Sequence, residues 1–502
     1  GGSWTPTSFL ALDEVVFDDT ATGTDVSVDA DVTPTKLTFD NTAKSFTLGG
    51  TNAIQGGVLV KSGTGSLTIS NANAFASTTI NAGTVTLGVG NALGTSSVAL
   101  NGGTLDINGQ SIANAVVLGG GTLTGDGSVS GVISGSGALG KTTAGTLTLT
   151  AANTYAGGTT VANGVLVLGN ATDTLLDTGA VAVTGGQLDL GANSDTIGAL
   201  AISAGSISGS GTLTVSSVSA TNDVDVTISA KLAGTGATLT KSGVGTLTLT
   251  GRNTYTGLTT VSNGTLVLGN ATDTLAGAVT VGGTGTLALG TNSDSIGALA
   301  ISGSGSVTGT GTLTVTSVTA NNTGSSSIST NITSSGALSK SGVGTLALTG
   351  ANTFTGTTTV TGGVLSFASG SLGASGNISV NGGTLRWATG NTQDISSRLV
   401  FTAAGSAGLD TNGNNVNLAS AIGSSATSSF TKSGNGTLVL AASATYTGAT
   451  NVAGGTLQIG TGGAVGDIGG TGTGSASNLV TVSSGATLRF YRSGTNLSLI
   501  HI

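Results

Sequence analysis

Residues 241–270 read KSGVGTLTLTGRNTYTGLTTVSNGTLVLGN, and this stretch recurs in close copies along the chain. The five copies begin at Lys61, Lys141, Lys241, Lys340 and Lys432. An aromatic residue follows each lysine by fourteen positions, namely Phe75, Tyr155, Tyr255, Phe354 and Tyr446. A motif that recurs in this way points to an array of stacked units rather than to unrelated globular domains.

Within the stretch, apolar and polar residues alternate with the period of a β-strand. Leu247 and Leu249 alternate with threonines, and Leu266 and Leu268 stand in a second alternating run. This period of two is typical of strands with one buried face, and the Gly- and Asn-rich segments between them suit tight turns. The stretch is predicted to fold as strand, turn, short strand, turn and strand, with the lysine opening the coil.

One such coil cannot bury its leucines alone, but a neighbour stacked on it can. The predicted fold is therefore all-β: a parallel β-solenoid that forms a single elongated rod, with Leu, Val, Ile and Ala inside and Thr, Ser and Asn outside. The composition agrees, because charged residues make up only 7%, methionine is absent and Glu14 is the sole glutamate among 502 residues. Strong helix formers are scarce, so helix is expected nowhere.

Three regions are predicted along the chain. Residues 1–56 are interpreted as an N-terminal capping region, because the first coil of a solenoid otherwise presents an open sheet edge. Residues 57–496 are predicted to be the β-helix itself. The final residues, 497–502, read LSLIHI and match a translated transposase end sequence from sequencing libraries, so they are interpreted as a non-native tail. The natural protein is then expected to continue into further coils and an envelope anchor.

The capping region is rich in acidic residues. It holds eight of the 21 in the chain: Asp13, Glu14, Asp18, Asp19, Asp25, Asp29, Asp31 and Asp40. Carboxylates in loops are the ligands that Ca²⁺ prefers, so a calcium site is one reading. Solvated acidic turns are the commoner reading, and no known calcium-loop pattern is present.

Charge and residue counts exclude several functions. The net charge of −8 offers no basic footprint for nucleic acid. Cysteine is absent, and the single histidine is His501, so neither a thiolate site nor a Ser-His-Asp triad can be assembled from the repeats. No apolar run approaches the roughly 18 residues of a membrane span.

One stretch matches the phosphate-loop pattern. Residues 135–142 read GSGALGKT, which satisfies GxxxxGK[ST]. That motif works only between a parallel strand and a helix whose N-terminus holds the phosphate. The following residues, AGTLTLT, predict a strand, and Lys141 is the repeat lysine. Nucleotide binding is not expected.

Two further groups are candidate sites. Asp195 and Asp294 occupy matched positions before apolar strands in a second class of repeat, and are interpreted as turn residues rather than as a catalytic pair. Arg386, Trp387 and Arg398 lie close together in sequence, and a tryptophan beside an arginine can form a sugar-stacking platform. Packing of the tryptophan against a loop is the commoner reading and is the one favoured here.

The unit KSGxGTLTLTGxNTYTGxTTVxxGTLxLG closely resembles the autotransporter-associated β-strand repeat, also called the passenger-associated transport repeat, of bacterial type V secretion. The resemblance implies a right-handed β-helix outside a Gram-negative cell, with repeats that aid secretion and folding. The repeat carries no active site in that family, so no catalytic, metal-binding or cofactor-binding residue is transferred to this chain.

The predicted function is therefore that of a secreted or surface-displayed structural protein, adhesive or matrix-forming, whose partner is a host or environmental surface or a polysaccharide. The competing hypothesis is a polysaccharide-active β-helix enzyme, a lyase or a glycosidase. That enzyme requires acidic and basic side chains that converge on one face of adjacent coils.

Overall fold

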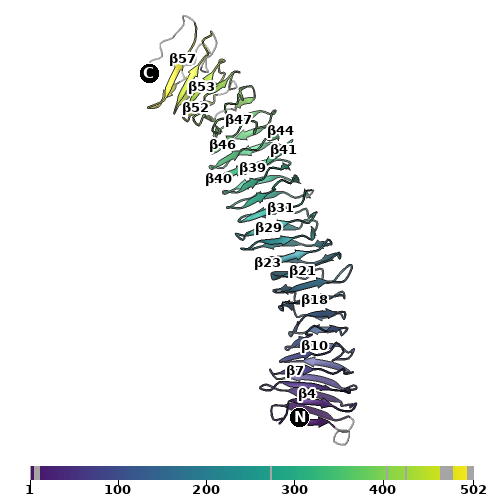
Figure 1. The fold of residues 1–502 in the computed structure, drawn as a ribbon. Helices are drawn as coiled ribbons and strands as arrows, with labels where there is room; N and C mark the ends of the chain where they lie inside the picture. The colour runs from purple at the N-terminus through teal and green to yellow at the C-terminus, as the bar shows by residue number, and fades with distance from the viewer. Residues whose placement is uncertain are drawn as a thin grey trace. The chain divides into compact units, whose positions relative to one another are not determined.

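Parallel β-strands stacked coil upon coil build the whole described part of the chain in the computed structural model (Figure 1). The structure describes residues 2–4, 12–271, 274–402, 405–423, 427–463, 468 and 479–493. It divides into two compact units, one of residues 1–239 and 243–256 and the other of residues 240–242 and 257–502. Each unit is a β-solenoid, as the alternating sequence predicted.

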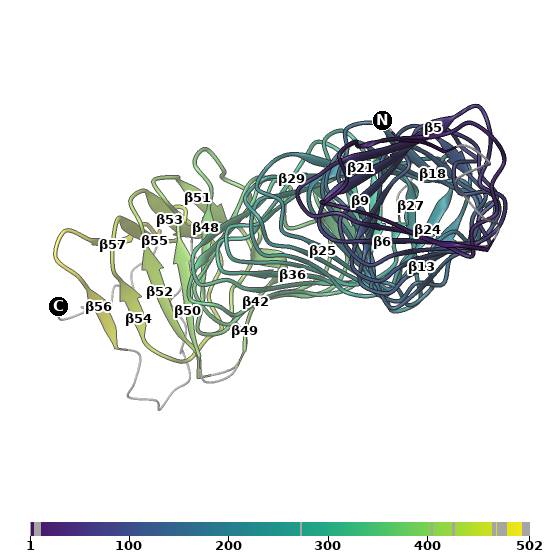
Figure 2. The ribbon, with the colours of Figure 1, turned by 90° about the horizontal axis from the view of Figure 1, so that it is seen from below.

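In the first unit, two parallel sheets run along the first coils. One contains β2 (Glu14–Asp18), β4 (Lys36–Asp40), β6 (Val58–Ser62), β8 (Ser77–Ile80), β10 (Val98–Leu100), β13 (Val116–Leu118) and β16 (Ile133–Gly135). The other contains β1 (Gly2–Trp4), β3 (Asp25–Val28), β5 (Phe46–Gly50), β7 (Ser66–Ile69), β9 (Thr84–Leu87), β11 (Thr104–Asp106) and β14 (Thr122–Thr124). Seen from below, the coils of this unit lie over one another (Figure 2).

The second unit shows the complete coil, which has three strands. One coil consists of β33 (Val279–Val281), β34 (Thr286–Ala288) and β35 (Asp294–Ile296), and the next of β36 (Leu299–Ser302), β37 (Ser306–Thr308) and β38 (Thr312–Thr314). Each strand pairs in parallel with its counterpart one coil on, so β33 pairs with β36, β34 with β37 and β35 with β38. The hydrogen bonds of the strand ladders therefore run between coils rather than within them.

The repeat that begins near Lys340 spans five strands of this pattern: β42 (Leu338–Lys340), β43 (Thr345–Leu348), β44 (Thr353–Phe354), β45 (Thr358–Val360) and β46 (Val364–Phe367). Strand β42 pairs with β45 and β43 pairs with β46. One repeat thus contains the three strands of one coil and the first two strands of the next coil. The first two strands of the repeat pair with its last two strands. The interpretation that the lysine opens the coil is wrong, because Lys340 is the last residue of β42.

The inward-facing rows are apolar, as predicted. Leu346, Leu348, Leu365 and Phe367 are fully buried, whereas Thr345 on the opposite face is half-buried. The prediction that Asn and Thr lie outside holds only in part, because Asn352 is buried at a corner of the coil and Thr358 is buried at the start of β45. Main-chain groups at a corner leave the strand ladder and need other partners, which polar side chains can supply.

A buried asparagine joins three coils at one corner. The Oδ1 atom of Asn153 accepts a hydrogen bond from Ile133 N (2.8 Å), and its Nδ2 atom donates to Ala151 O (3.0 Å) and Thr174 O (2.8 Å). The equivalent Oδ1 atoms of Asn73, Asn253 and Asn352 accept from Ile54 N, Leu232 N and Ile332 N. The fifth repeat has Ala444 at this position, so the asparagine strengthens the corner but does not define it.

The aromatic residue of each repeat is buried beside a threonine. The hydroxyl groups of Tyr155 and Thr159 lie 2.6 Å apart, and those of Tyr446 and Thr450 lie 2.7 Å apart. Where the aromatic is phenylalanine, the corresponding Thr78 and Thr358 hydroxyls are buried with no hydrogen-bond partner. The tyrosine hydroxyl therefore satisfies a group that phenylalanine leaves unpaired.

Residues 14–50, assigned from sequence to the capping region, form the same type of coil. Strand β2 pairs with β4 and β4 with β6, so that Phe17, Phe39 and Lys61 lie in register. The rings of Phe17 and Phe39 stack with centroids 5.0 Å apart. The capping role itself stays a prediction, and Leu497–Ile502 with His501 lie outside the described residues.

Helix is almost absent from the described residues. Its one occurrence there is the 3₁₀ turn η1 (Ser396–Arg398). Across the described ranges, no helix has the length and apolar character needed to cross a membrane.

The alternation predicts opposite responses at two neighbouring positions of β29 (Thr246–Leu249). Leu249→Asp should destabilise the fold by several kcal/mol, because it buries an unpaired carboxylate, whereas Thr248→Asp on the outer face should change stability little. Urea denaturation followed by circular dichroism measures both. Equal losses for the two variants would mean that the faces are assigned incorrectly.

The unpaired threonine predicts a stabilising substitution. Phe354→Tyr should raise the free energy of unfolding by about 1 kcal/mol, because the new hydroxyl can bond to Thr358 as Tyr155 bonds to Thr159. In a Thr358→Val background the same change should destabilise, since the added hydroxyl then has no partner. Urea midpoints of the four proteins test this, and a loss of stability in both backgrounds contradicts it.

Candidate functional site

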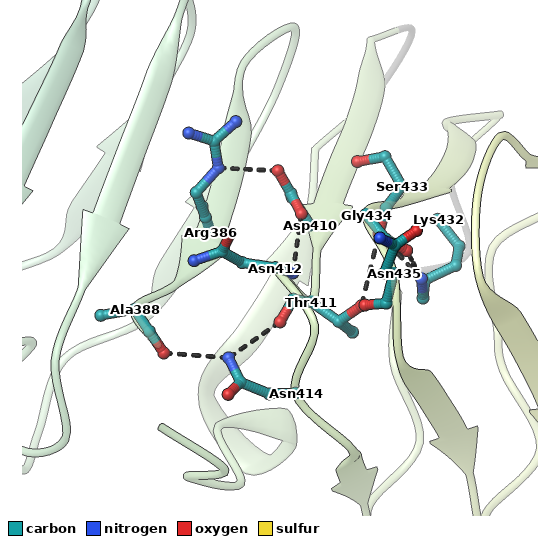
Figure 3. Close-up of polar contacts among 10 residues, drawn as sticks. All are labelled: Arg386, Ala388, Asp410, Thr411, Asn412, Asn414, Lys432, Ser433, Gly434 and Asn435. Carbon is teal, nitrogen blue, oxygen red and sulfur yellow. Dashed lines mark hydrogen bonds and ion pairs between the residues drawn. The ribbon is translucent and has the colours of Figure 1, made fainter. Parts of the chain in front are cut away.

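The recurring lysine is buried in every repeat and lies among main-chain carbonyl groups. None of Lys61, Lys141, Lys241, Lys340 and Lys432 is more than 1% exposed. The ammonium group of Lys432 donates to Ser433 O (2.8 Å) and Gly434 O (2.7 Å) in the next turn, and to Gly454 O (2.9 Å) one coil on. Figure 3 shows the first two carbonyls around this nitrogen. The same arrangement surrounds Lys340, which donates to Gly342 O and, at 3.3 Å, to Gly362 O.

A glycine in the following coil makes this contact possible. The five equivalent residues are Gly83, Gly164, Gly264, Gly363 and Gly455, and their φ angles lie between +55° and +69°. A Cβ atom on Gly363 would lie 2.3 Å from Gly344 O and 2.4 Å from Gly342 O, the carbonyl that Lys340 binds. Only glycine accepts both this backbone angle and this close approach.

Burial lowers the pKa of these lysines. Desolvation brings the pKa of Lys61 to about 8, although the charges of Asp40 and Asp19 act in the opposite direction. Desolvation also brings the pKa of Lys432 to about 8, against the charge of Asp410. Lys61 donates to the carbonyl oxygens of its own turn, and Lys432 donates to those of its own turn and of the next coil, so the structure gives both lysines a structural role.

A network of polar side chains extends from the Lys432 corner over the two preceding coils (Figure 3). Asp410, the last residue of β50 (Ser406–Asp410), accepts hydrogen bonds from Arg386 Nε (2.7 Å) and Asn412 N (2.8 Å). The Nδ2 atom of Asn414 donates to Ala388 O (2.9 Å) and Thr411 O (2.8 Å). The network contains one ion pair, between Arg386 and Asp410, and otherwise joins main-chain groups of successive coils.

The hypothesis of a sugar-stacking platform at Trp387 is wrong. Trp387, the last residue of β48 (Thr384–Trp387), is fully buried, packs against Phe367 and donates its indole N–H to Gln393 O (2.9 Å). Arg398 donates from its guanidinium group to Leu372 O, Gly373 O and Gly376 O. Both side chains hold loops of neighbouring coils in place.

The phosphate-loop match does not form a phosphate-binding loop. Gly135 ends β16, Lys141 ends β17 (Leu139–Lys141), and β18 (Thr146–Leu149) follows where a helix would be required. The ammonium group of Lys141 points inward and contacts Asp126 Oδ1 (3.3 Å) and Thr143 Oγ1 (2.8 Å). The strand predicted from AGTLTLT is confirmed.

An open pocket of about 300 Å³ lies beside that lysine. It is lined by Asp106, Asn108, Gly109, Gly125, Asp126 and Thr143. Two carboxylates from adjacent coils, Asp106 and Asp126, face this hollow, and Asp126 also accepts a hydrogen bond from Thr143 Oγ1 (2.8 Å). The sequence analysis missed this pair, because its members lie twenty residues apart and belong to no motif.

The N-terminal acids lie in separate turns and bond to main-chain N–H groups. The carboxylate of Asp19 accepts from the N–H groups of Thr42, Ala43 and Lys44, and the Thr42 bond is the largest cause of its lowered pKa. Asp31 Oδ1 accepts from Ala53 N (2.9 Å). Over the described ranges, no three Asp, Glu, His or Cys side chains gather as a metal site.

Asp195 and Asp294 are buried rather than exposed in turns. Asp195 begins β22 (Asp195–Thr196) and Asp294 begins β35, at the same position of the coil. Asp195 Oδ2 accepts hydrogen bonds from Thr174 N and Leu175 N, both at 3.2 Å, and so closes a turn of the preceding coil. Each aspartate lies within its own unit of the structure.

The lowered lysine pKa values predict a specific pH dependence. Between pH 8 and about 10 the folded Lys61 and Lys432 lose protons that the unfolded chain retains, so stability should rise with pH. Above about pH 10 the buried Tyr155, whose pKa is raised by burial, has the opposite effect. Urea midpoints at several pH values measure the slope.

Lys61→Met should reduce that slope, whereas Leu59→Val in the same strand should lower stability at every pH and leave the slope unchanged. A wild-type stability that stays flat between pH 8 and 9.5 would mean that the surrounding carbonyls keep the lysines protonated.

The family pattern described as the passenger-associated-transport-repeat matches five segments of this chain. These are residues 59–87, 139–168, 239–268, 338–367 and 430–459. Each match begins two residues before the repeat lysine, where the structure places the lysine-bearing strand. No curated protein and no solved structure matches the chain, so the assignment rests on the repeats and on the solenoid that they form. The chain thus carries five passenger-associated transport repeats, and these repeats and the β-solenoid that they form fit a protein of the autotransporter-passenger type.

Proposed function

We propose that this chain is a structural passenger displayed on the surface of a Gram-negative cell, where it acts as an adhesin or a matrix component. One observation carries the proposal: the lysine and the aromatic that recur in all five repeats, and the corner asparagine that recurs in four, are buried inside the solenoid. The buried lysine, the corner asparagine and the buried aromatic bond to or pack against adjacent coils. The recurring residues of the repeat therefore serve to join successive coils.

This arrangement suits a chain that folds after it has crossed a membrane. Each coil supplies the main-chain groups that the lysine and asparagine of its neighbour require, so a folded coil is a template for the next. The repeats would then aid secretion by drawing the emerging chain into the solenoid. The outer surface, rich in Thr and Ser and poor in charge, would meet a host surface, an environmental surface or a polysaccharide.

The experiment fuses the chain to a secretion leader and an outer-membrane translocator in a Gram-negative host and measures protease-protected material on the cell surface. Wild type and Thr248→Asp should be displayed equally, whereas Leu249→Asp should reduce display severalfold, because its coils cannot stack. Adhesion of the displaying cells to glycan-coated surfaces tests the adhesive role. Equal display of all three proteins would contradict a role of coil stacking in secretion.

A polysaccharide-active enzyme is the second candidate, and the pocket at Asp106 and Asp126 is the observation that favours it. Two carboxylates on one face can act as acid and base in glycoside cleavage. Release of sugar that is lost in Asp126→Asn would support the enzyme. Absence of any release from a panel of acidic and neutral polysaccharides would leave the structural role.

A further inference from the structure

Two carboxylate oxygens, one in the 170–178 turn and one on the Asp195 side chain that closes this turn, have no hydrogen-bond partner. Asp195 is only 3% exposed, and while its Oδ2 atom accepts two main-chain N–H groups, its Oδ1 atom is buried and unpaired. The Oδ1 atom of Asp173, in the turn itself, is likewise buried and unpaired. A buried, unpaired carboxylate oxygen is costly, so something must satisfy these two atoms.

The surroundings of this turn are negatively charged. Burial raises the pKa of Asp195 to about 7, and the charge of Asp173 acts in the same direction. Burial and then the charge of the exposed Asp177 raise the pKa of Asp173. Neither of the ion pairs found among the described residues includes these aspartates. The missing partner therefore comes from outside the chain, as a water molecule, a proton or a cation, and of these only a cation balances the negative charge of both carboxylates.

We propose that Asp173 and Asp195 bind a Ca²⁺ ion that fastens the 170–178 turn to the following coil. Ca²⁺ takes carboxylate, carbonyl and water oxygens in flexible geometry, so two carboxylates with main-chain and water oxygens suffice. One cation compensates both unpaired oxygens, whereas one proton neutralises a single carboxylate. With few charged ligands, the affinity should lie in the range of extracellular calcium modules, with a Kd of about 10⁻⁴ to 10⁻³ M.

The sequence repeats this arrangement once. NATDTL at residues 170–175 recurs at 270–275, and DTIGALAIS from Asp195 recurs as DSIGALAIS from Asp294. The partner of Asp173 in the second copy is Asp273, which lies outside the described residues, so the proposal depends on the first pair. If the second copy also binds Ca²⁺, replacing Asp173 and Asp195 should remove about half of the bound ions.

Terbium luminescence tests the site directly, since Tb³⁺ occupies oxygen-rich calcium sites and emits when a nearby tyrosine is excited. Tyr155 is close enough to Asp195 for that carboxylate to raise its pKa. Added Tb³⁺ should give emission that Ca²⁺ suppresses, and Tyr155→Phe, Asp173→Asn and Asp195→Asn should each lower it. Asp126→Asn should leave it unchanged, and a loss in Asp126→Asn instead would place the ion at the other carboxylate pair and overturn the proposal.

Thermal unfolding supplies a readout independent of luminescence. At pH 8, millimolar Ca²⁺ should raise the Tm of wild type by several degrees relative to a chelator, and the rise should be smaller in Asp195→Asn and Asp173→Asn. Asp173 is half-buried, so its variant serves if Asp195→Asn fails to fold. The proposal is wrong if Ca²⁺ leaves the wild-type Tm unchanged and Asp195→Asn has a higher Tm than wild type at pH 8 but not at pH 4. In that case a proton, and not a cation, neutralises the buried carboxylate.

Discussion

The hydrogen bonding of main-chain groups between successive coils is the constraint on which this structure depends. Along the straight sides, parallel strands pair with strands one coil away and satisfy one another. At the corners the chain turns and the ladder stops, which leaves carbonyl and N–H groups without strand partners. Lys340 and Asn352 supply those partners from inside the solenoid. The polar residues of the repeat therefore sit where the backbone requires them.

The same constraint explains the glycines. A lysine that reaches the carbonyls of its own turn and of the next coil needs the two turns close together, and Gly363 provides this with a positive φ and no side chain. Its equivalents in the other repeats share that conformation. The high glycine content of this chain thus reflects, at these positions, the close approach of one coil to another rather than flexibility.

Most of the recurring polar and aromatic side chains among the described residues are engaged inside the solenoid. The lysines, the corner asparagines and Trp387 are engaged in holding coils together. The acidic pairs are the exceptions: Asp106 and Asp126 face solvent in an open pocket, and Asp173 and Asp195 hold unpaired oxygens within a turn. These two acidic pairs are therefore the positions at which the further roles proposed for this chain would be tested.

The sequence by itself determined the all-β class, the parallel solenoid, the inward leucines and the turns, because strand alternation and turn chemistry are local properties of neighbouring residues. It also showed that Lys141 belongs to the repeat and not to a phosphate loop. Only the tertiary structure decided that the lysines and Asn153 lie inside, that Trp387 is buried, and that Asp195 bonds to the turn that contains Asp173. The partners in these contacts are main-chain atoms or side chains about twenty residues away. Every residue has the same main-chain carbonyl group, so the sequence does not show which carbonyl accepts a hydrogen bond from a buried lysine. That partner is set only when the coils stack.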